Sequence, residues 1–225
     1  MNYPNAVSRK QWQEARKAFL EDEKQVTRAR DALNARRRRL PMTPIDRSYT
    51  FKSTIGDLRL IDLFEGRRQL IIYHNMLAPG SDHVCPGCSL YCDHIGSLEH
   101  LHARRTTFAV VSRATVPEIE RVKARLGWTF PWYSCFGTTF HDDFVGTEDS
   151  SFGLSVFIRN SDGIFQTYFT SGRGVELPSN TFCLLDITPW GRQETWEQSP
   201  DGWPQEPAHS WVRIHDQYET HGLRK

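Results

Sequence analysis

The sequence predicts an α/β protein in which helices cover a mixed β-sheet, preceded by one long N-terminal helix. Between residues 69 and 127, apolar runs typical of buried strands alternate with helical patterns. Two further strand patterns then follow around a short polar turn. Alternating strands and helices are typical of an α/β sheet, and a closing antiparallel hairpin makes that sheet mixed.

Composition favours a globular protein that binds neither nucleic acid nor a membrane. The chain has 225 residues, of which 38% are hydrophobic and 12% aromatic, so a packed core is expected. Its net charge is only +1, which argues against a dedicated nucleic-acid binder. No apolar run approaches the ~20 residues of a membrane span, and no apolar segment follows the first basic residues. A cytoplasmic location is therefore expected.

The first 40 residues form a separate, basic segment. They hold 11 Lys or Arg and 5 Asp or Glu, and the pattern predicts one helix from Ser8 to Leu40. Ser8 and Gln11 have the spacing of a capping box, and Pro41 ends the helix because it lacks a backbone donor. Apolar residues recur seven apart along this helix, at Trp12, Phe19, Val26, Leu33 and Leu40.

Such a narrow apolar seam suits a helix that lies along a partner surface. We expect a homodimer with the seam at or near its interface. A helix that binds an anionic partner, or one packed on its own domain with a solvated basic face, are the alternatives. The expected organisation is an N-terminal helical arm over residues 1–41, a main domain over 42–195 and a C-terminal extension packed on that domain over 196–225.

The main domain is expected to begin with a hairpin and a buried strand. "YTFKSTIGDLRL" predicts the hairpin, with Gly56 near its turn, and "LIDLFEG" predicts a helical turn closed by Gly66. "RQLIIYHNM" is a continuous apolar run, typical of a strand buried on both faces. A helix is then expected from Pro86 to about Arg104, followed by a second buried strand in "TTFAVVSR".

The second half of the main domain continues the alternation. "TVPEIERVKARLG" predicts a helix capped by Thr115 and stopped by Gly127. "GLSVFIRNSDGIFQTYFT" predicts two strands around a turn at residues 160–163, and "PSNTFCLLDITP" a further helix. The tail is expected to begin as a Pro-rich loop and to end in a short helix.

The stretch with most chemical content is Cys85-Pro86-Gly87-Cys88, which follows a buried strand and opens a helix. Free backbone N–H groups and the helix dipole at that position favour a thiolate. Thiols in such motifs have their pKa lowered from ~8.5 toward ~7 or below. In a compartment that keeps thiols reduced, a close cysteine pair is more often catalytic or metal-binding than structural. The arrangement is that of thioredoxin-type redox motifs.

Within this motif Cys85 is expected to be the attacking thiolate, and Cys88, one turn inside, the resolving thiol. Pro86 fits the first helical position, where a backbone N–H would have no partner within the helix. Gly87 leaves room for a substrate. His74, at the end of the preceding strand, is expected near the motif. Cys92 is either a third redox thiol or a small core residue.

Two further readings of the cysteines remain open. Cys135 is either close to the site or a structural residue, and Cys183 is expected in the core. A zinc site is the alternative use of the motif, with three cysteines and one of several histidines as ligands. That alternative has only one Cys-x-x-Cys pair, so no metal is expected. The residues it would use are Cys85, Cys88, Cys92 and one of His83, His94, His100 or His102.

Several stretches in this order resemble a bacterial family, the domain of unknown function 899 family. They include "LIIYHNMLAPGSDHVCPGCSLYCDHIGSLEHL", "FAVVSRA", "LGWTFPWYS" and "VFIRNSDGIFQTY", and the resemblance covers nearly the whole chain. Members are described as predicted dithiol-disulfide oxidoreductases with a thioredoxin-like fold. The resemblance therefore implies a three-layer α/β/α arrangement and a thiol–disulfide activity without a cofactor.

Carried over residue by residue, the family's Cys-Pro-x-Cys corresponds to Cys85 and Cys88, and its Tyr-His strand end to Tyr73 and His74. Its Val-Ser-Arg ends at Arg113, at the carboxyl end of a predicted strand, where open α/β sheets place ligand groups. Arg113 is expected either to stabilise a thiolate or an anionic substrate, or to be a salt-bridged structural arginine.

The family's Gly-Trp-x-Phe-Pro-Trp begins at Gly127 and ends at Trp132. Trp132 is expected either to wall the substrate groove or to fill core. Thioredoxins at large place a proline opposite the cysteines, where this chain has Gly153 or Leu154. That departure favours a small substrate over general protein-disulfide exchange.

Three functions are compatible with these observations. The first is a dithiol-disulfide oxidoreductase in which an external thiol reductant resets the cysteine pair. The second is a thiol peroxidase in which a peroxide oxidises Cys85 and Cys88 resolves it. The third is a non-enzymatic binding protein on the same scaffold.

Overall fold

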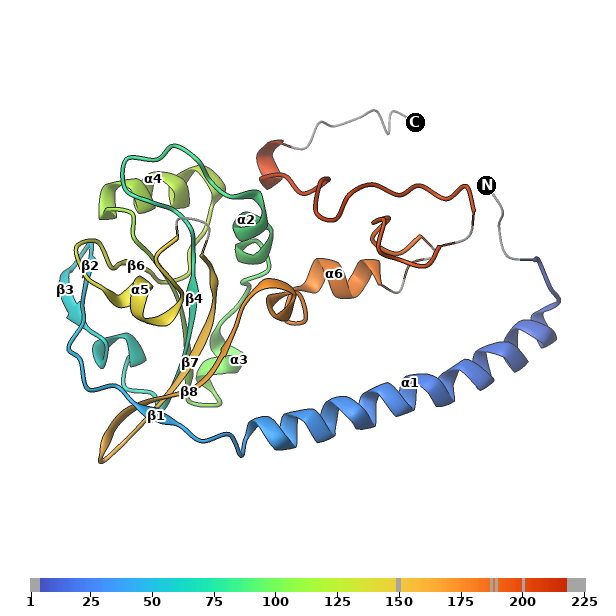
Figure 1. Cartoon of the computed structure of the whole chain (residues 1–225), viewed down its shortest axis with the longest axis horizontal. Helices are drawn as coiled ribbons and strands as arrows, with labels where there is room; N and C mark the ends of the chain where they lie inside the picture. Colours follow the sequence, from blue (N-terminus) through green and yellow to red (C-terminus); the bar gives the residue numbers. More distant parts are fainter. Residues whose placement is uncertain (1–4, 149–150, 187, 189, 200, 218–225) are drawn as a thin grey trace.

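The computed structural model describes residues 5–148, 151–186, 188, 190–199 and 201–217. Within them, eight strands form one mixed sheet in the order β1-β8-β7-β4-β5-β6-β2-β3 (Figure 1). Only the β4–β5 and β5–β6 pairs are parallel. The strands are β1 (Thr43–Pro44), β2 (Thr50–Ser53), β3 (Gly56–Arg59), β4 (Gln69–His74), β5 (Thr106–Ser112), β6 (Trp132–Ser134), β7 (Gly153–Asn160) and β8 (Gly163–Thr170).

Helices connect and cover these strands. The α-helices are α1 (Arg9–Arg37), α2 (Pro86–Cys92), α3 (Glu99–His102), α4 (Val116–Leu126), α5 (Phe140–Phe144) and α6 (Asn180–Leu185). Single 3₁₀ turns lie at η1 (Asp62–Phe64), η2 (Gly172–Val175) and η3 (His215–Gln217). Among the described residues, none of these helices combines the length and apolar character that crossing a bilayer requires.

The centre of the sheet has the thioredoxin-like arrangement that was expected. β4, α2 and β5 form a parallel βαβ unit, β7 pairs antiparallel with β4, and β8 pairs antiparallel with β7. The cysteine motif lies at the start of the crossover helix of this unit. The fold class predicted from the alternating pattern is therefore confirmed.

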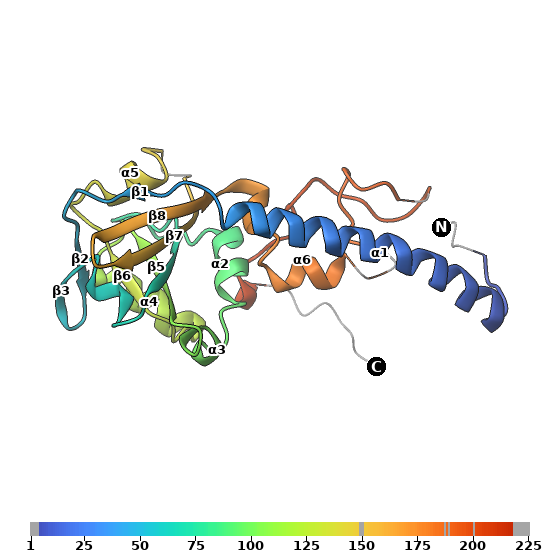
Figure 2. The same ribbon diagram turned by 90° about the horizontal axis from the view of Figure 1, so that it is seen from below.

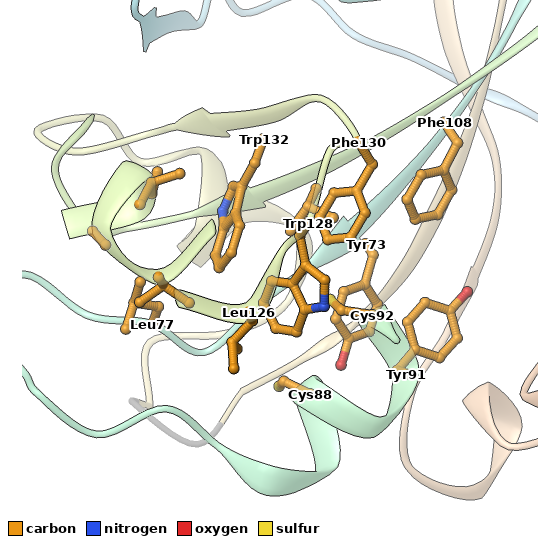
Figure 3. Close-up of a cluster of buried hydrophobic side chains, with 14 of the residues drawn as sticks. Tyr73, Leu77, Cys88, Tyr91, Cys92, Phe108, Leu126, Trp128, Phe130 and Trp132 are labelled. Carbon is orange, nitrogen blue, oxygen red and sulfur yellow. The ribbon is translucent and has the colours of Figure 1, made fainter. Parts of the chain in front are cut away.

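Each face of the sheet carries its own hydrophobic core, which gives the three layers. One core joins Tyr73 of β4 and Phe108 of β5 to α2, α4 and the tryptophans that follow α4 (Figure 3). The other joins Leu70 and Ile72 of β4 to the β2 strand, η1 and Phe140 of α5. Because side chains alternate along a strand, neighbouring residues of β4 belong to opposite cores.

The long N-terminal helix forms as predicted at its start and ends slightly early. The capping box between Ser8 and Gln11 is present, and the helix ends at Arg37 rather than Leu40. None of its residues is buried, and it projects away from the sheet (Figures 1 and 2). Near its end, Arg37 stacks on Tyr168 with the guanidinium carbon 4.7 Å from the ring centroid.

The prediction of one helix from Pro86 to about Arg104 is wrong. α2 ends at Cys92, and α3 begins only at Glu99. The carboxylate of Asp93, the residue that caps α2, accepts hydrogen bonds from the Trp128 indole at 2.8 Å and the His215 ring at 2.7 Å. These contacts fix the turn that ends the helix, and they come from segments far away in the sequence.

Four short elements were not predicted: β1, β6, α5 and η2. β6 lies in "PWYS", which is too short to show the alternation of a longer strand and begins with a proline. It is formed because Val110 N–H of β5 donates to the Pro131 carbonyl at 2.8 Å, which extends the parallel pairing. The expected C-terminal short helix is η3; residues 200 and 218–225 of the expected extension lie outside the described residues.

Candidate redox site

The cysteine motif lies beyond the carboxyl end of β4, where open α/β sheets place ligand and catalytic groups. Cys85 is the N-cap of α2, with an extended backbone at φ −63° and ψ 122°. Pro86 occupies the first turn, where its missing N–H costs nothing. The sequence therefore sets Cys85 at the half-buried positive end of the helix and turns Cys88 inward.

The Cys85 sulfur is surrounded by hydrogen-bond donors. The Cys88 backbone N–H donates to it at 3.4 Å, and the side chain is half-buried. The Cys88 thiol hydrogen bond lowers the pKa of Cys85 to about 6, against the opposing effect of desolvation. The backbone N–H groups of Cys88 and Gly87 and the charge of His83 act in the same direction. Cys85 is therefore largely a thiolate at neutral pH.

Cys88 has the opposite character. It is buried, and its pKa is raised well above the ordinary value by its hydrogen bond to Cys85 and by burial. The Tyr73 hydroxyl donates a hydrogen bond to the Cys88 sulfur. Tyr73 is itself buried and stacks on Tyr91, with ring centroids 4.2 Å apart (Figure 3). A chain of hydrogen bonds thus runs from Tyr73 through the Cys88 thiol to the Cys85 thiolate.

Gly87 lies beside the Cys85 sulfur. A Cβ at position 87 would lie 3.8 Å from that sulfur, which is ordinary van der Waals contact, so the available space does not require glycine there. Cys92 lies deeper in α2, buried, with the Asn75 amide nitrogen 3.8 Å from its sulfur. Burial raises the pKa of Cys92, so it behaves as a core thiol.

The structure does not bring His74 to the cysteines. As the neighbour of Tyr73 on β4, it faces the opposite core, where its Nε2 lies 2.8 Å from the Ser155 hydroxyl and its ring stacks on Phe140. Desolvation lowers the pKa of His74 to about 3, so it is neutral at physiological pH. The period of two along a strand accounts for this difference from the prediction.

For Arg113 and Trp132 the structure shows contacts with residues other than the cysteine pair. Arg113 acts electrostatically on the Cys135 thiol, whose pKa burial raises to about 12. Trp132 is buried and donates its indole N–H to the Ser112 hydroxyl at 3.0 Å, which assigns it to the core. Cys135 is buried beside β5, and Cys183 is exposed rather than in the core as expected.

Cys85 opens onto a cavity of about 480 Å³. One wall is the motif itself with Tyr73, and the opposite wall comes from the chain after β8 and from the C-terminal segment. Its remaining lining residues are Met76, Leu90, Phe152, Gly172, Arg173, Val175, Glu176, Phe182, His209 and Val212. This volume is within the range of small-molecule sites.

Sequence reasoning missed two parts of this site. Tyr73 was named only through the family resemblance. Successive side chains of any strand point to opposite faces, so Tyr73 and His74 in "LIIYH" must face opposite ways. That signal separates the two residues but does not say which faces the cysteines. The wall formed by Phe182 and Val212 had no local signal, because both lie far from the motif in the sequence.

No group of three or more His, Cys, Asp or Glu side chains in the described part of the chain is arranged to hold a metal ion. The fold and the Cys-x-x-Cys position together define a thioredoxin-like protein. Within that class, the chain belongs to the family described as bacterial proteins of unknown function, DUF899, which it matches over residues 1–218. No curated protein sequence matches it.

Solved structures with a similar fold include PrxQ of Xylella fastidiosa, at 16% identity and a TM-score of 0.41, covering 64% of this chain and 94% of that one. A bacterioferritin comigratory protein of Xanthomonas campestris, described for its alkyl peroxide reduction activity, has 15% identity and a TM-score of 0.39, covering 64% and 95%. A hypothetical protein of Sinorhizobium meliloti has 11% identity and a TM-score of 0.39, covering 59% and 74%. These similarities concern the fold alone.

Proposed function

We propose that the protein is a dithiol–disulfide oxidoreductase that uses Cys85 and Cys88. The observation that carries the proposal is the pairing of a thiolate at a helix N-cap with a buried thiol one turn away, hydrogen-bonded to it. The two cysteines have pKa values moved in opposite directions, which separates an attacking group from a resolving group. Either cysteine in isolation would not support this division.

In the first step the Cys85 thiolate attacks one sulfur of a substrate disulfide. A bond forms between Cys85 and that sulfur, and the other sulfur leaves as a thiolate that takes a proton from solvent. Cys88 then loses its proton and attacks the Cys85 sulfur, which releases the second substrate thiolate. The substrate has gained two electrons, and the protein holds a Cys85–Cys88 disulfide, which an external dithiol reduces.

Tyr73 acts in the second step as a positioning residue. Its hydroxyl donates to the Cys88 sulfur, so it favours the thiolate that Cys88 must become. Stacking on Tyr91 fixes the ring from which the hydroxyl is presented.

Trapping of the intermediate tests this proposal. In Cys88→Ser the resolving thiol is lost, so a mixed disulfide between Cys85 and the substrate should accumulate and appear in the intact mass. The matched variant Cys85→Ser should form none, although Cys88 is still present. A mixed disulfide on Cys88 in the second variant, or on neither cysteine in the first, contradicts the assignment.

Peroxide reduction is the second candidate, favoured by the small cavity that Cys85 enters. There the thiolate attacks the terminal oxygen, giving a sulfenic acid and an alcohol or water. Cys88 then condenses with the sulfenic acid, releasing water and forming the same disulfide. A dimedone adduct on Cys85 in the Cys88→Ser variant after peroxide treatment supports this reaction. If the adduct does not form, or forms much more slowly than Cys85 exchanges with a disulfide, peroxide reduction is excluded.

We further propose that α1 pairs with α1 of a second copy in antiparallel orientation. Its seam residues Trp12, Phe19 and Val26 are 51%, 58% and 68% exposed, so the seam lies in solvent in a single chain. Residues 24–39 hold seven Lys or Arg and one Asp, whereas residues 9–23 hold four of each sign. Antiparallel pairing sets each basic half against a neutral half, which avoids like-charge repulsion.

The proposed cellular context follows from this chemistry. Small thiol-reactive substrates and an external thiol reductant are the expected partners. A cytoplasmic location fits a pair of cysteines kept reduced between turnovers.

A further inference from the structure

The cavity over Cys85 is closed by parts of the chain that come after the βαβ unit. Phe182 of α6 and Val212 of the C-terminal segment are buried and pack together with Leu90 of α2. All three line the cavity, as do Phe152 and Val175. The sulfur is therefore approached between apolar walls rather than across an open surface.

Buried polar contacts hold this wall in place. Arg192 is buried, donates to Glu176 at 2.6 Å and to Asp186 at 2.6 and 2.8 Å, and lies 4.5 Å above the Phe182 ring. Glu194 is fully buried and accepts from the indoles of Trp196 and Trp211 at 2.6 and 2.9 Å. Breaking such buried networks is costly, so the wall is a fixed part of the site.

The C-terminal segment is also fastened on its far side. Asp216 forms a salt bridge with Arg125 of α4 at 2.8 Å, and His215 contacts Asp93 at the end of α2. Ile214 is buried in the same core as the cysteine motif. The segment that carries Val212 is thus anchored on both sides of the cavity.

The charged groups of the cavity neutralise one another. The Glu176 carboxylate, buried at the edge, receives Arg192 and Arg173 on one oxygen and lies 3.3 Å from the His209 ring on the other. Arg173 also lies 4.3 Å above the Trp196 ring. The charged side chains of the lining, Arg173, Glu176 and His209, thus contact one another through the Glu176 carboxylate, so a charged substituent of a substrate would compete with these contacts.

We infer that the disulfide substrate is a small, uncharged molecule with apolar substituents. This rests on the proposed function and adds its substrate class. A cavity of about 480 Å³ accommodates a small molecule, and its apolar walls at Phe182 and Val212 favour a small disulfide over one on a folded protein. A charged substituent would lose hydration and would have to displace one of the contacts made by Glu176, which disfavours it.

Two chromogenic disulfides of the same reaction type test this inference. Dipyridyl disulfide is uncharged and aromatic, and dithiobis-nitrobenzoate is an aromatic disulfide with two carboxylates. Rates of oxidation of the reduced wild-type protein are measured by stopped flow and divided by the rates of each reagent with a free low-molecular-weight thiol. The expected result is a normalised preference of about tenfold or more for the uncharged reagent, the effect of leaving a polar group unpaired in a desolvated site.

Two variants localise the preference. Val212→Lys places a cation in the wall and should shift the preference toward the dianionic reagent, while Leu177→Lys, at an exposed position outside the lining, should leave it unchanged. If Val212→Lys fails to fold, Phe182→Ala should lower the rate with dipyridyl disulfide while alkylation of Cys85 by iodoacetamide is unchanged. Equal or reversed preference in the wild type overturns the inference, as does faster reduction of insulin disulfides than of dipyridyl disulfide.

These outcomes are separate from those that test the function. If neither reagent produces a Cys85–Cys88 disulfide, the oxidoreductase itself is rejected. If both do so with no preference for the uncharged reagent, the oxidoreductase stands and only the substrate class is wrong.

Discussion

Replacing Cys88 by alanine should raise the pKa of Cys85, because the Cys88 thiol supplies the largest of the effects that lower it. A hydrogen bond to a charged group is worth about 1.5–3 kcal/mol, and one pKa unit corresponds to about 1.4 kcal/mol. From the value of about 6 in the wild type, the pKa of Cys85 should therefore rise by about 1 to 2 pH units.

The matched variant is Cys88→Ser. A serine hydroxyl retains a donor in the same place, so the pKa of Cys85 should stay close to that of the wild type. Both variants keep the backbone N–H that donates to Cys85 at 3.4 Å. Comparing them therefore separates the side-chain donor from the helix N-terminus.

The assay is the rate of iodoacetamide alkylation of Cys85 as a function of pH, followed by mass spectrometry of the peptide that contains it. At pH 7 the alanine variant should react about two- to tenfold more slowly than the wild type, because the thiolate fraction falls from most of the molecules to between about a half and about a tenth. Equal pH profiles for alanine and serine would refute the role of the thiol hydrogen bond.

Three further predictions concern Tyr73, the Cys85 thiolate and the apolar seam of α1. Tyr73→Phe removes the hydroxyl that favours the Cys88 thiolate, so the mixed disulfide should live about tenfold longer by quenched-flow mass spectrometry, while the alkylation rate of Cys85 is unchanged. An unaltered lifetime would contradict the role of Tyr73 in positioning Cys88. The stability of the reduced wild type relative to Cys85→Ser should be greatest above pH ~8.5 and should fall as the pH drops through about 6, because the pKa of Cys85 is lower in the folded than in the unfolded state. Scanning calorimetry at a series of pH values measures this difference in thermal stability, and the absence of the trend would argue against a Cys85 thiolate. Val26→Asp should halve the mass measured by light scattering, whereas Gln25→Asp, its neighbour off the seam, should not; a wild-type monomer would exclude the proposed dimer.

The sequence was sufficient for those parts of the fold that depend on local patterns. Thr115 and Gly127 mark the limits of α4, and the turn at residues 160–163 separates β7 from β8, as predicted. β6 and the end of α2 escaped prediction because contacts with distant segments determine them. Pairing with β5 forms β6, and the contacts of Asp93 with Trp128 and His215 fix the end of α2.

For the candidate site too, only the parts that depend on local patterns could be predicted from the sequence. The position and spacing of Cys85 and Cys88 follow from the strand before them and the helix after them, both of which are local. Which of Tyr73 and His74 faces the motif depends on how β4 pairs with β5 and β7, and a single sequence does not state that register. The wall at Val212 depends on an irregular segment held by buried side chains, for which no periodic pattern exists.

The most direct test of the central claim is peptide mapping after equilibration of the full-length protein in a series of dithiol–disulfide redox buffers. The account predicts one reversible disulfide, between Cys85 and Cys88, while the buried Cys92 and Cys135 remain reduced throughout. A motif that stays reduced in every buffer, or a Cys85 that pairs with any cysteine other than Cys88, would contradict it.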